Sequence, residues 1–568
     1  MRHAQSAVRS PLKPTHQRFV VVAVSTDARS IQVRSTADVL GRVTQVDSSV
    51  DGAMWSRQST FLFDDSFSGA SHWPGQLTRS VAYVGATSTT SGTPYVSDVS
   101  YDDQFRVVSK KVTVPAVEGL LAGSYVFGST YDAAGHQTSV SYPAAGGLGA
   151  ETVSTAFTSW GLPGVLTSSL VGAPSPLAAA PAFDTVGRLI GRTLGPAAGA
   201  GRVVTGYGFA GAGQRLSEVT ATVGAVAPVA VRDDTYLFDS VGNPLSVRDT
   251  VVGQSQCNSF DTRNRLSSAF TSSVVSCGVG TADGFGPVPF RESYVYDAAT
   301  NNMTSITRGL TSPVTTTQTY AAAGHAHAVS ATGGGSVASF TYNADGSLAS
   351  RTGVGAGSYA WDGLGRLVTA TSGGVATSMV YGADGSRLLR KDAASTTLFL
   401  DGMELKLTGA TVTGTRFYAH AGTTVGMRTS VGGLVWVLGD TQASFSLTVD
   451  AGTGVVARQR YTPYGAVRGS GSTLGTDRGW LGKTADAGSG LNYLGARFYD
   501  SGLAHFLSPD PLLDTGNPKS YAAYSYAGDN PIGFTEPTGL MVQQEKGGGC
   551  STTCNDGTLS LRRPTMSR

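Results

Sequence analysis

Two acidic residues, each followed by proline, stand near the end of the chain: Asp510 in SPDP and Glu536 in EPTG. A pair of carboxyl groups can hydrolyse a peptide bond when one is ionised and deprotonates water while the other is protonated and polarises the carbonyl. Two carboxyls held close together meet this requirement because they cannot both ionise. Acidic residues before proline also commonly open turns, so the residue types alone favour turns over catalysis. Asp514 and Asp529 lie nearer to Asp510 in the sequence than Glu536 does. Spacing alone therefore does not determine which of the three acids would pair with Asp510.

Histidine and cysteine spacings give the candidates for a metal site. His325 and His327 would lie on one face of a strand, as metal ligands do, but no third ligand stands close to them in the sequence. Cys550 and Cys554 have no further Cys or His after them, which argues against zinc and leaves a small disulfide or no bond. We therefore predict no metal and no cofactor.

The other two cysteines, Cys257 and Cys277, bear on the redox compartment. In an exported protein they would bridge a loop, and in a reducing compartment they would remain two buried thiols. The sequence favours neither state over the other.

Composition indicates a folded protein that is rich in turns. Among 568 residues there are 75 glycines, the charged share is 14%, and the net charge is only +2. A dedicated nucleic-acid surface would need a concentrated Lys/Arg excess, so a nucleic-acid partner is not expected. No apolar run is long enough to span a membrane. The six apolar residues 19–24 are too few for the hydrophobic region of a signal peptide, and we predict a β-strand there.

One unit returns along the chain: an aromatic residue, an acidic or amide residue, small residues, a glycine, then a polar and an apolar residue. The clearest copies begin at Tyr131, Phe183, Phe238, Tyr342, Trp361 and Tyr381, with weaker ones at Tyr101, Phe260 and Tyr296. The acidic residues Asp132, Asp184 and Asp239 of these copies are expected to accept hydrogen bonds from turn amides rather than to act in catalysis. Internal repetition predicts a repeat architecture.

Each copy has the pattern of a β-hairpin. Phe340 and Tyr342 alternate onto one face, the turn that follows ends at Gly346, and residues 347–351 alternate again. An isolated hairpin is marginally stable in water, so each must pair with the next to bury its aromatic side chain. The prediction is an all-β fold in which hairpins form one long antiparallel sheet, curled or spiralled to hide one face.

These repeats resemble the YD repeats of the Rhs family, which includes the C components of Tc toxins and, more distantly, teneurins. Further stretches with the family's pattern are GHAHAV at 324–329, RQRYTPYG at 458–465, GWLGK at 479–483, GLNYLGARFYD at 490–500, FLSPDP at 506–511 and the segment from Asn530-Pro531 to Gly539-Leu540. The last four resemble the Rhs repeat-associated core. The similarity covers about residues 100–540.

The resemblance implies a strip of β-sheet spiralled into a hollow shell, closed by the core, with a toxic domain after the core in bacterial members. We accordingly expect a poorly defined β-rich segment at 1–95, a YD-repeat shell at 96–435, the core at 436–540 and a short polar tail at 541–568. The tail is too short to bury a core alone, so we expect the toxin domain to be absent or truncated.

The resemblance also implies self-cleavage after the final leucine of the core, here the Leu540–Met541 bond, by an aspartyl-protease-like mechanism. Asp510 matches the first family aspartate and is the candidate general base. Glu536 stands where the family usually has aspartate, and a displacement of about 1 Å would cost about a hundredfold in rate. His505 stands where the family usually has an arginine that would support the acid pair.

Two functions from different classes follow. In the first, the chain is a shell that encapsulates a C-terminal polymorphic toxin for competition between bacteria, is handled by secretion machinery, and cuts itself once. In the alternative, it is a non-catalytic cell-surface or secreted structural and adhesion protein that contacts a neighbouring cell or a glycan. An eroded gene remnant would also fit the departures at Glu536 and His505. In either functional case we expect an extracellular or cell-surface location after export.

Overall fold

The computed structural model describes residues 21–540 and 542–544, except for 68, 70, 173, 212–214, 276, 278–281, 471–473 and 513–520. Asp514, Met541, Cys550 and Cys554, which the sequence singled out, lie outside these residues. Within the described part, no helix is long and apolar enough to cross a membrane.

The prediction of an all-β fold with one long antiparallel sheet is confirmed. Of the described residues, 54% lie in strands and 3% in helices, and 36 of the described strands belong to a single antiparallel sheet that is not closed. The chain forms two compact units, which are described separately.

The smaller unit includes residues 21–126 and Met379–Arg390 of the described chain. Its elements are β1 (Val21–Thr26), β2 (Gln32–Ala37), β3 (Val43–Ser49), β4 (Ser56–Asp65), β5 (His72–Val84), β6 (Thr93–Tyr101), β7 (Val107–Val114) and the 3-10 turn η1 (Ala116–Leu121). β1 confirms the strand predicted at 19–24 over its described residues, and β1 to β7 pair as successive antiparallel neighbours. Strands β8 (Gly123–Tyr131), β28 (Val375–Tyr381) and β29 (Arg387–Lys391) have residues in both units.

The larger unit contains the remaining strands, most of them successive hairpins. They are β9 (Gln137–Tyr142), β10 (Glu151–Phe157), β11 (Pro163–Ser168), β12 (Ala178–Phe183), β13 (Leu189–Leu194), β14 (Val203–Ala210), β15 (Arg215–Val223), β16 (Val229–Phe238), β17 (Pro244–Asp249), β18 (Gln254–Phe260), β19 (Leu266–Ser272), β20 (Arg291–Tyr296), β21 (Met303–Arg308), β22 (Val314–Thr319), β23 (Ala331–Gly334), β24 (Ala338–Tyr342), β25 (Leu348–Gly353), β26 (Gly357–Trp361) and β27 (Leu367–Ser372). After them come β30 (Ser395–Leu400), β31 (Met403–Thr408), β32 (Thr411–His420), β33 (Thr423–Thr429), β34 (Gly433–Gly439), β35 (Phe445–Asp450) and β36 (Val456–Arg458).

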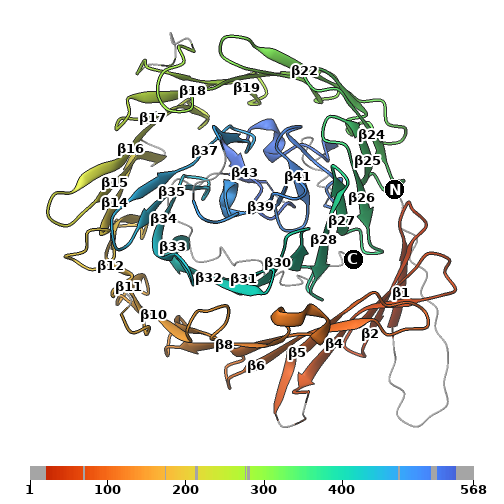
Figure 1. Cartoon of the computed structure of the whole chain (residues 1–568). Coiled ribbons are helices and arrows are strands. Elements are labelled where there is room, and N and C mark those ends of the chain that lie inside the picture. The colour runs from red at the N-terminus through yellow and green to blue at the C-terminus, as the bar shows by residue number, and fades with distance from the viewer. Residues whose placement is uncertain are drawn as a thin grey trace. The chain divides into compact units, whose positions relative to one another are not determined.

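The C-terminal part of this unit has short elements only. They are β37 (Arg460–Tyr461), β38 (Val467–Arg468), η2 (Trp480–Gly482), β39 (Thr484–Asp486), β40 (Leu491–Tyr493), β41 (Phe498–Asp500), β42 (His505–Phe506), η4 (Ala527–Asp529), β43 (Phe534–Thr535) and β44 (Gln543–Gln544). Figure 1 shows that the hairpins of the larger unit curve around these elements, and we call residues 459–540, which contain all of them except β44, the core segment.

In the repeat turns at Asp132, Asp184 and Asp239, the carboxylate accepts a backbone amide of the turn, as predicted. In the copy at Trp361, one oxygen of Asp362 accepts the backbone N–H groups of Leu364 and Arg366, both at 2.9 Å. The other oxygen accepts the Nε–H of Arg366 at 2.8 Å. The polar residue after the turn glycine is therefore part of the turn.

The repeat aromatics tie one hairpin to the one before it. The indole Nε1 of Trp361 donates to the carbonyl of Leu348 at 2.8 Å. The hydroxyl of Tyr296 donates to the carbonyl of Leu266, also at 2.8 Å. Tyr342 and Trp361 are half-buried by these contacts. The N–H or O–H group of each ring thus donates to a backbone carbonyl, while the apolar part of the ring packs on the sheet.

Two layers of strands pack face to face within the larger unit. Residues of β10 to β16 and of β32 to β35 share one apolar cluster, in which Trp436 is fully buried. The buried carboxylate of Glu151 in β10 pairs with Arg416 of β32 and accepts the Tyr418 hydroxyl at 2.8 Å. This buried, hydrogen-bonded charge pair links the two layers.

The core segment packs on the inner face of β19 to β21. Its aromatic residues Tyr464, Trp480, Tyr499 and Tyr526 are buried with Leu266, Ala269, Tyr294 and Ile306 in one cluster. The core also reaches a repeat turn, because the Tyr524 hydroxyl donates to the carbonyl of Gly346 at 2.7 Å. The amide of Leu348 donates to the Leu507 carbonyl at 2.8 Å beside it.

Gly346 and Gly365 occupy equivalent turn positions with φ of 85° and 75°, and only the first lies against the core. A Cβ on Gly346 would lie 2.5 Å from the Tyr524 hydroxyl, whereas one on Gly365 would meet nothing within 4 Å. We expect Gly365→Ala to cost about 1 kcal/mol for its positive φ, and Gly346→Ala about 2–3 kcal/mol because the core contact is also displaced. The midpoints of chemical denaturation of the two variants test this, and equal midpoints would contradict the contact.

Candidate functional site

Three loops of the core segment meet around the side chain of Arg497. Arg497 stands immediately before β41, Asp510 follows β42, and Glu536 follows β43. Strands β39 to β42 form one small antiparallel sheet, so Arg497 has a fixed position at its edge. The two acidic residues identified in the sequence are thereby brought to one arginine.

Arg497 uses its whole guanidinium group. Nη2 donates to Asp510 Oδ2 at 2.8 Å and also to Glu536 Oε1. Nη1 donates to the Ala523 carbonyl at 3.0 Å, and Nε donates to the carbonyl of Gly539. The Phe506 ring covers the guanidinium, with Cζ 3.7 Å from its centroid. A planar fork of donors suits this simultaneous contact with two carboxylates and the backbone.

Glu536 is the more deeply buried of the two acids, with 2% of the residue exposed. Its Oε2 accepts the amide of Ala527 at 3.2 Å, and its own amide donates to the Tyr526 hydroxyl at 3.3 Å. Burial raises the pKa of Glu536 to about 7, although the Arg497 charge acts in the opposite direction. The carboxyl group is therefore partly protonated at neutral pH.

Asp510 is held in a fixed orientation but lies nearer to solvent. Its side chain is 17% exposed, its Oδ1 accepts the Leu512 amide at 2.8 Å, and its amide donates to the Ala523 carbonyl at 2.9 Å. Burial raises its pKa, against the lowering effect of Arg497. The group of Arg497, Asp510 and Glu536 has no net charge when one carboxyl is ionised and the other is protonated. Because Glu536 is the more deeply buried acid, the proton is favoured on Glu536.

The chain leading to the predicted cleavage bond is bound to the same arginine. The Gly539 amide closes a turn onto the Glu536 carbonyl at 3.0 Å, and the Ala496 amide donates to the Thr538 carbonyl at 3.0 Å. Gly539 has a φ of 67°, and a Cβ there would lie 3.1 Å from the backbone nitrogen of Arg497. Leu540 follows and is half-buried. Met541 lies outside the described residues.

Arg497 is the residue that the sequence interpretation missed. We expected the support of the acid pair to be weakened, because His505 stands where the family that the chain resembles usually has arginine. The structure supplies a cation from the GLNYLGARFYD stretch instead. His505 is buried and bonded to the Tyr320 hydroxyl at 2.9 Å and to the Ala504 carbonyl. Burial lowers its pKa to about 4, so it is neutral. The only signal in the sequence was an arginine inside the GLNYLGARFYD stretch, and its spacing does not indicate which residues it contacts.

The other candidate residues lie elsewhere. Asp529 is buried and lines a small cavity with His327 and His505, at a different place from the Arg497 carboxylates. His327 Nδ1 bonds to Asn302 Oδ1 at 2.7 Å, and the His325 ring lies 6.3 Å from that of Tyr342. Among the described residues, no group of three or more His, Cys, Asp or Glu side chains is arranged to hold a metal ion.

Comparison with known proteins identifies the fold through structure and not through sequence. No protein-family profile matches the chain. No curated protein matches it either. Solved structures do: TcdB2-TccC3 without its hypervariable C-terminal region has a TM-score of 0.71 at 17% identity over 91% of this chain. A Photorhabdus luminescens Tc holotoxin pore has a TM-score of 0.72 at 17% identity over 94%.

The chain spans about a quarter of those neighbours, 27% of the TcdB2-TccC3 chain and 28% of the holotoxin chain. At this level of identity the similarity concerns the fold alone. The repeating β-hairpin sheet of this chain is thus similar to a fold known from Tc toxin chains.

Proposed function

We propose that this chain is an Rhs-type β-shell whose core segment cuts the Leu540–Met541 bond once. The observation that supports the proposal is that Asp510 and Glu536 share Arg497, which also binds the carbonyl of Gly539. The acid pair and the chain one residue before the bond are therefore fixed by one side chain.

In the proposed reaction, ionised Asp510 takes a proton from a water molecule that attacks the carbonyl carbon of Leu540. Protonated Glu536 donates a hydrogen bond, and then its proton, to the carbonyl oxygen as the tetrahedral intermediate forms. Collapse of the intermediate breaks the C–N bond, and the amine of Met541 leaves with a proton supplied by the acid pair. Atoms and charges balance without a metal or cofactor.

Arg497 is assigned a positioning role in this proposal. It holds both carboxyls on one nitrogen and keeps the Gly539 carbonyl oriented through Nε. Its own pKa is lowered by burial, against the raising effect of Glu536 and Asp510. Fixing reacting groups in a productive geometry contributes a large share of the rate in enzymes generally.

The shell would enclose the segment that the cut releases. The fold similarity to TcdB2-TccC3 supports a hollow β-shell of the Rhs type, and a toxin is the kind of cargo we propose for the polypeptide after Leu540. Such a protein would act outside the cell that makes it.

We expect the purified full-length chain to lose residues 541–568, whereas Asp510→Asn and Glu536→Gln remain intact because each removes one member of the acid pair. Intact-mass spectrometry during a time course after refolding measures this. Asp362→Asn is the matched control, since the Asp362 carboxylate accepts bonds from Leu364 and Arg366 within its own repeat turn, and a Cβ on Gly365 of that turn would meet nothing within 4 Å. The control is expected to cut at the wild-type rate.

A wild-type chain that stays intact from pH 4 to 8 would reject self-cleavage and leave the alternative of a non-catalytic structural or adhesion protein. A fragment that ends elsewhere than at Leu540 would reject the assigned bond. Cleavage at Leu540 that persists in both acid variants would reject the roles assigned to Asp510 and Glu536.

The rate of self-cleavage should have a bell-shaped dependence on pH. Glu536 must be protonated and its pKa is raised to about 7, so the rate is expected to fall about tenfold for each pH unit well above 7. Asp510 must be ionised, so the rate is also expected to fall in acid, at a pH above the ordinary range of aspartate because its pKa is raised. Initial rates of product formation in buffers of constant ionic strength measure the profile, and a rate that rises steadily to pH 9 would contradict these roles.

A further inference from the structure

The connection between β19 and β20 contacts the core segment through its last residues. Arg468 of β38 donates from Nε and Nη2 to the carbonyl of Val288, at 3.0 and 2.7 Å. Its guanidinium lies over the Phe290 ring at 4.5 Å, and Arg468 is 7% exposed. A Cβ on Gly469 would lie 2.6 Å from the Val288 side chain, so the Gly469 backbone lies directly against that side chain.

The same connection is fastened to the neighbouring strand β18. Buried Gln254 donates from Nε2 to the carbonyls of Phe285 at 2.6 Å and Pro287 at 3.2 Å. Its Oε1 accepts Arg468 Nη2 at 3.3 Å. Gln254 therefore joins the wall strand, the connection and the core segment in one hydrogen-bond network.

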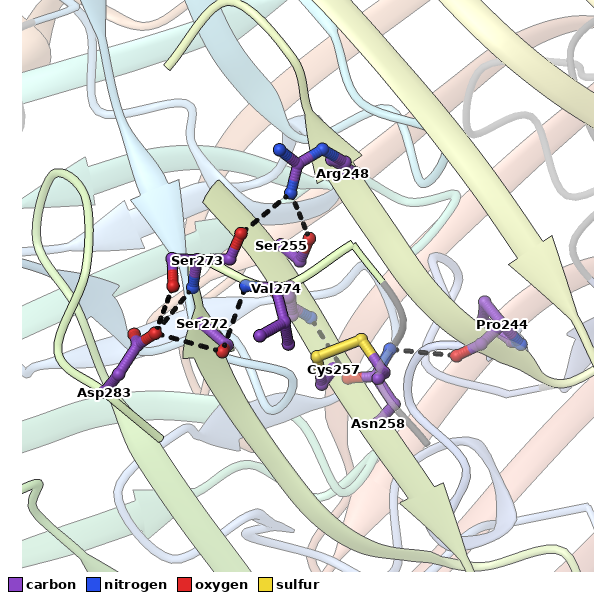
Figure 2. The surroundings of a disulfide bond; sticks show 11 residues. Pro244, Arg248, Ser255, Cys257, Asn258, Ser272, Ser273, Val274 and Asp283 are labelled. Carbon is purple, nitrogen blue, oxygen red and sulfur yellow. Dashed lines mark hydrogen bonds between the residues drawn. A yellow bond between two sulfur atoms is a disulfide. The ribbon is translucent and has the colours of Figure 1, made fainter. Parts of the chain in front are cut away.

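The start of the connection carries a covalent fastening (Figure 2). Cys257 of β18 and Cys277 form a disulfide, which decides between the two states that the sequence left open. Asp283 adds bonds to Ser273, at 2.9 Å from the backbone N–H and 2.5 Å from the hydroxyl. Ser273 and Asp283 are both solvent-exposed, so these polar bonds contribute less than the covalent bond does.

We propose that this disulfide-fastened connection is a redox-sensitive clasp, closed by the Cys257–Cys277 bond, that holds the core hairpin β37–β38 against β18. While the bond is intact, the carbonyls of Pro287 and Val288 are presented to Gln254 and Arg468. Reduction frees the start of the connection, and the contact with Arg468 weakens. The clasp does not depend on self-cleavage.

The chemical step requires an external dithiol. Cys277 is partly exposed whereas Cys257 is 1% exposed, so a thiolate of the dithiol attacks Sγ of Cys277 and Sγ of Cys257 leaves as a thiolate that takes up a proton. The second thiol of the dithiol then displaces Cys277. The protein gains two electrons and two protons as it becomes two thiols, and the reductant becomes its own disulfide.

Hydrogen exchange of the full chain with and without dithiothreitol tests the clasp. Reduction is expected to speed exchange about tenfold at residues 282–290 and also at residues 459–469 of the core, because the two segments are coupled. In the oxidised protein, Arg468→Gln is expected to speed exchange at 459–469 while leaving the strand residues 254–272 unchanged.

The remaining cysteines supply the matched control. Cys550→Ser/Cys554→Ser keeps the clasp and should respond to dithiothreitol as the wild type does, whereas Cys257→Ser/Cys277→Ser should exchange like reduced wild type and not respond. Faster exchange confined to 282–290 would overturn the coupling to the core. Unchanged exchange in both segments after complete reduction, verified by thiol titration, would overturn the clasp altogether.

Discussion

The sheet depends on the contact between each repeat aromatic and the hairpin before it. Tyr296 and Trp361 each donate to the first carbonyl of the preceding return strand, and Tyr320 does the same to Met303 at 2.7 Å. In the turn at Asp261, Arg265 is held by the carboxylate and lies 4.3 Å over the Tyr296 ring of the next hairpin. An isolated hairpin is only marginally stable in water. The same short motif closes its turn and also binds it to the next hairpin.

This motif explains how far the sequence could predict the fold. Alternation, the Asp turn and the recurring aromatic are local signals, and together they give an all-β array of paired hairpins without knowledge of long-range contacts. The packing of β10 on β32 through Glu151 and Arg416 could not be predicted in the same way. Those residues lie 265 positions apart, and nothing in their surroundings identifies either as a partner.

The candidate site shows the same division. The motifs SPDP and EPTG indicated the acids Asp510 and Glu536, whereas the arginine that joins them had to come from the structure. The sequence pattern directed attention to position 505, but that side chain faces Tyr320. The residues around Arg497 in the sequence do not indicate that it contacts Asp510 and Glu536. Those contacts arise only when the three loops come together in the folded core.

The placement of Arg497 also bears on whether glutamate can replace aspartate at position 536. A longer side chain would be expected to misplace the carboxyl by about 1 Å if the backbone were fixed by the sheet alone. Here the Glu536 carboxyl is fixed from its far end, by Arg497 on one oxygen and the Ala527 amide on the other. The longer side chain of glutamate therefore still places its carboxyl on the cation that Asp510 contacts.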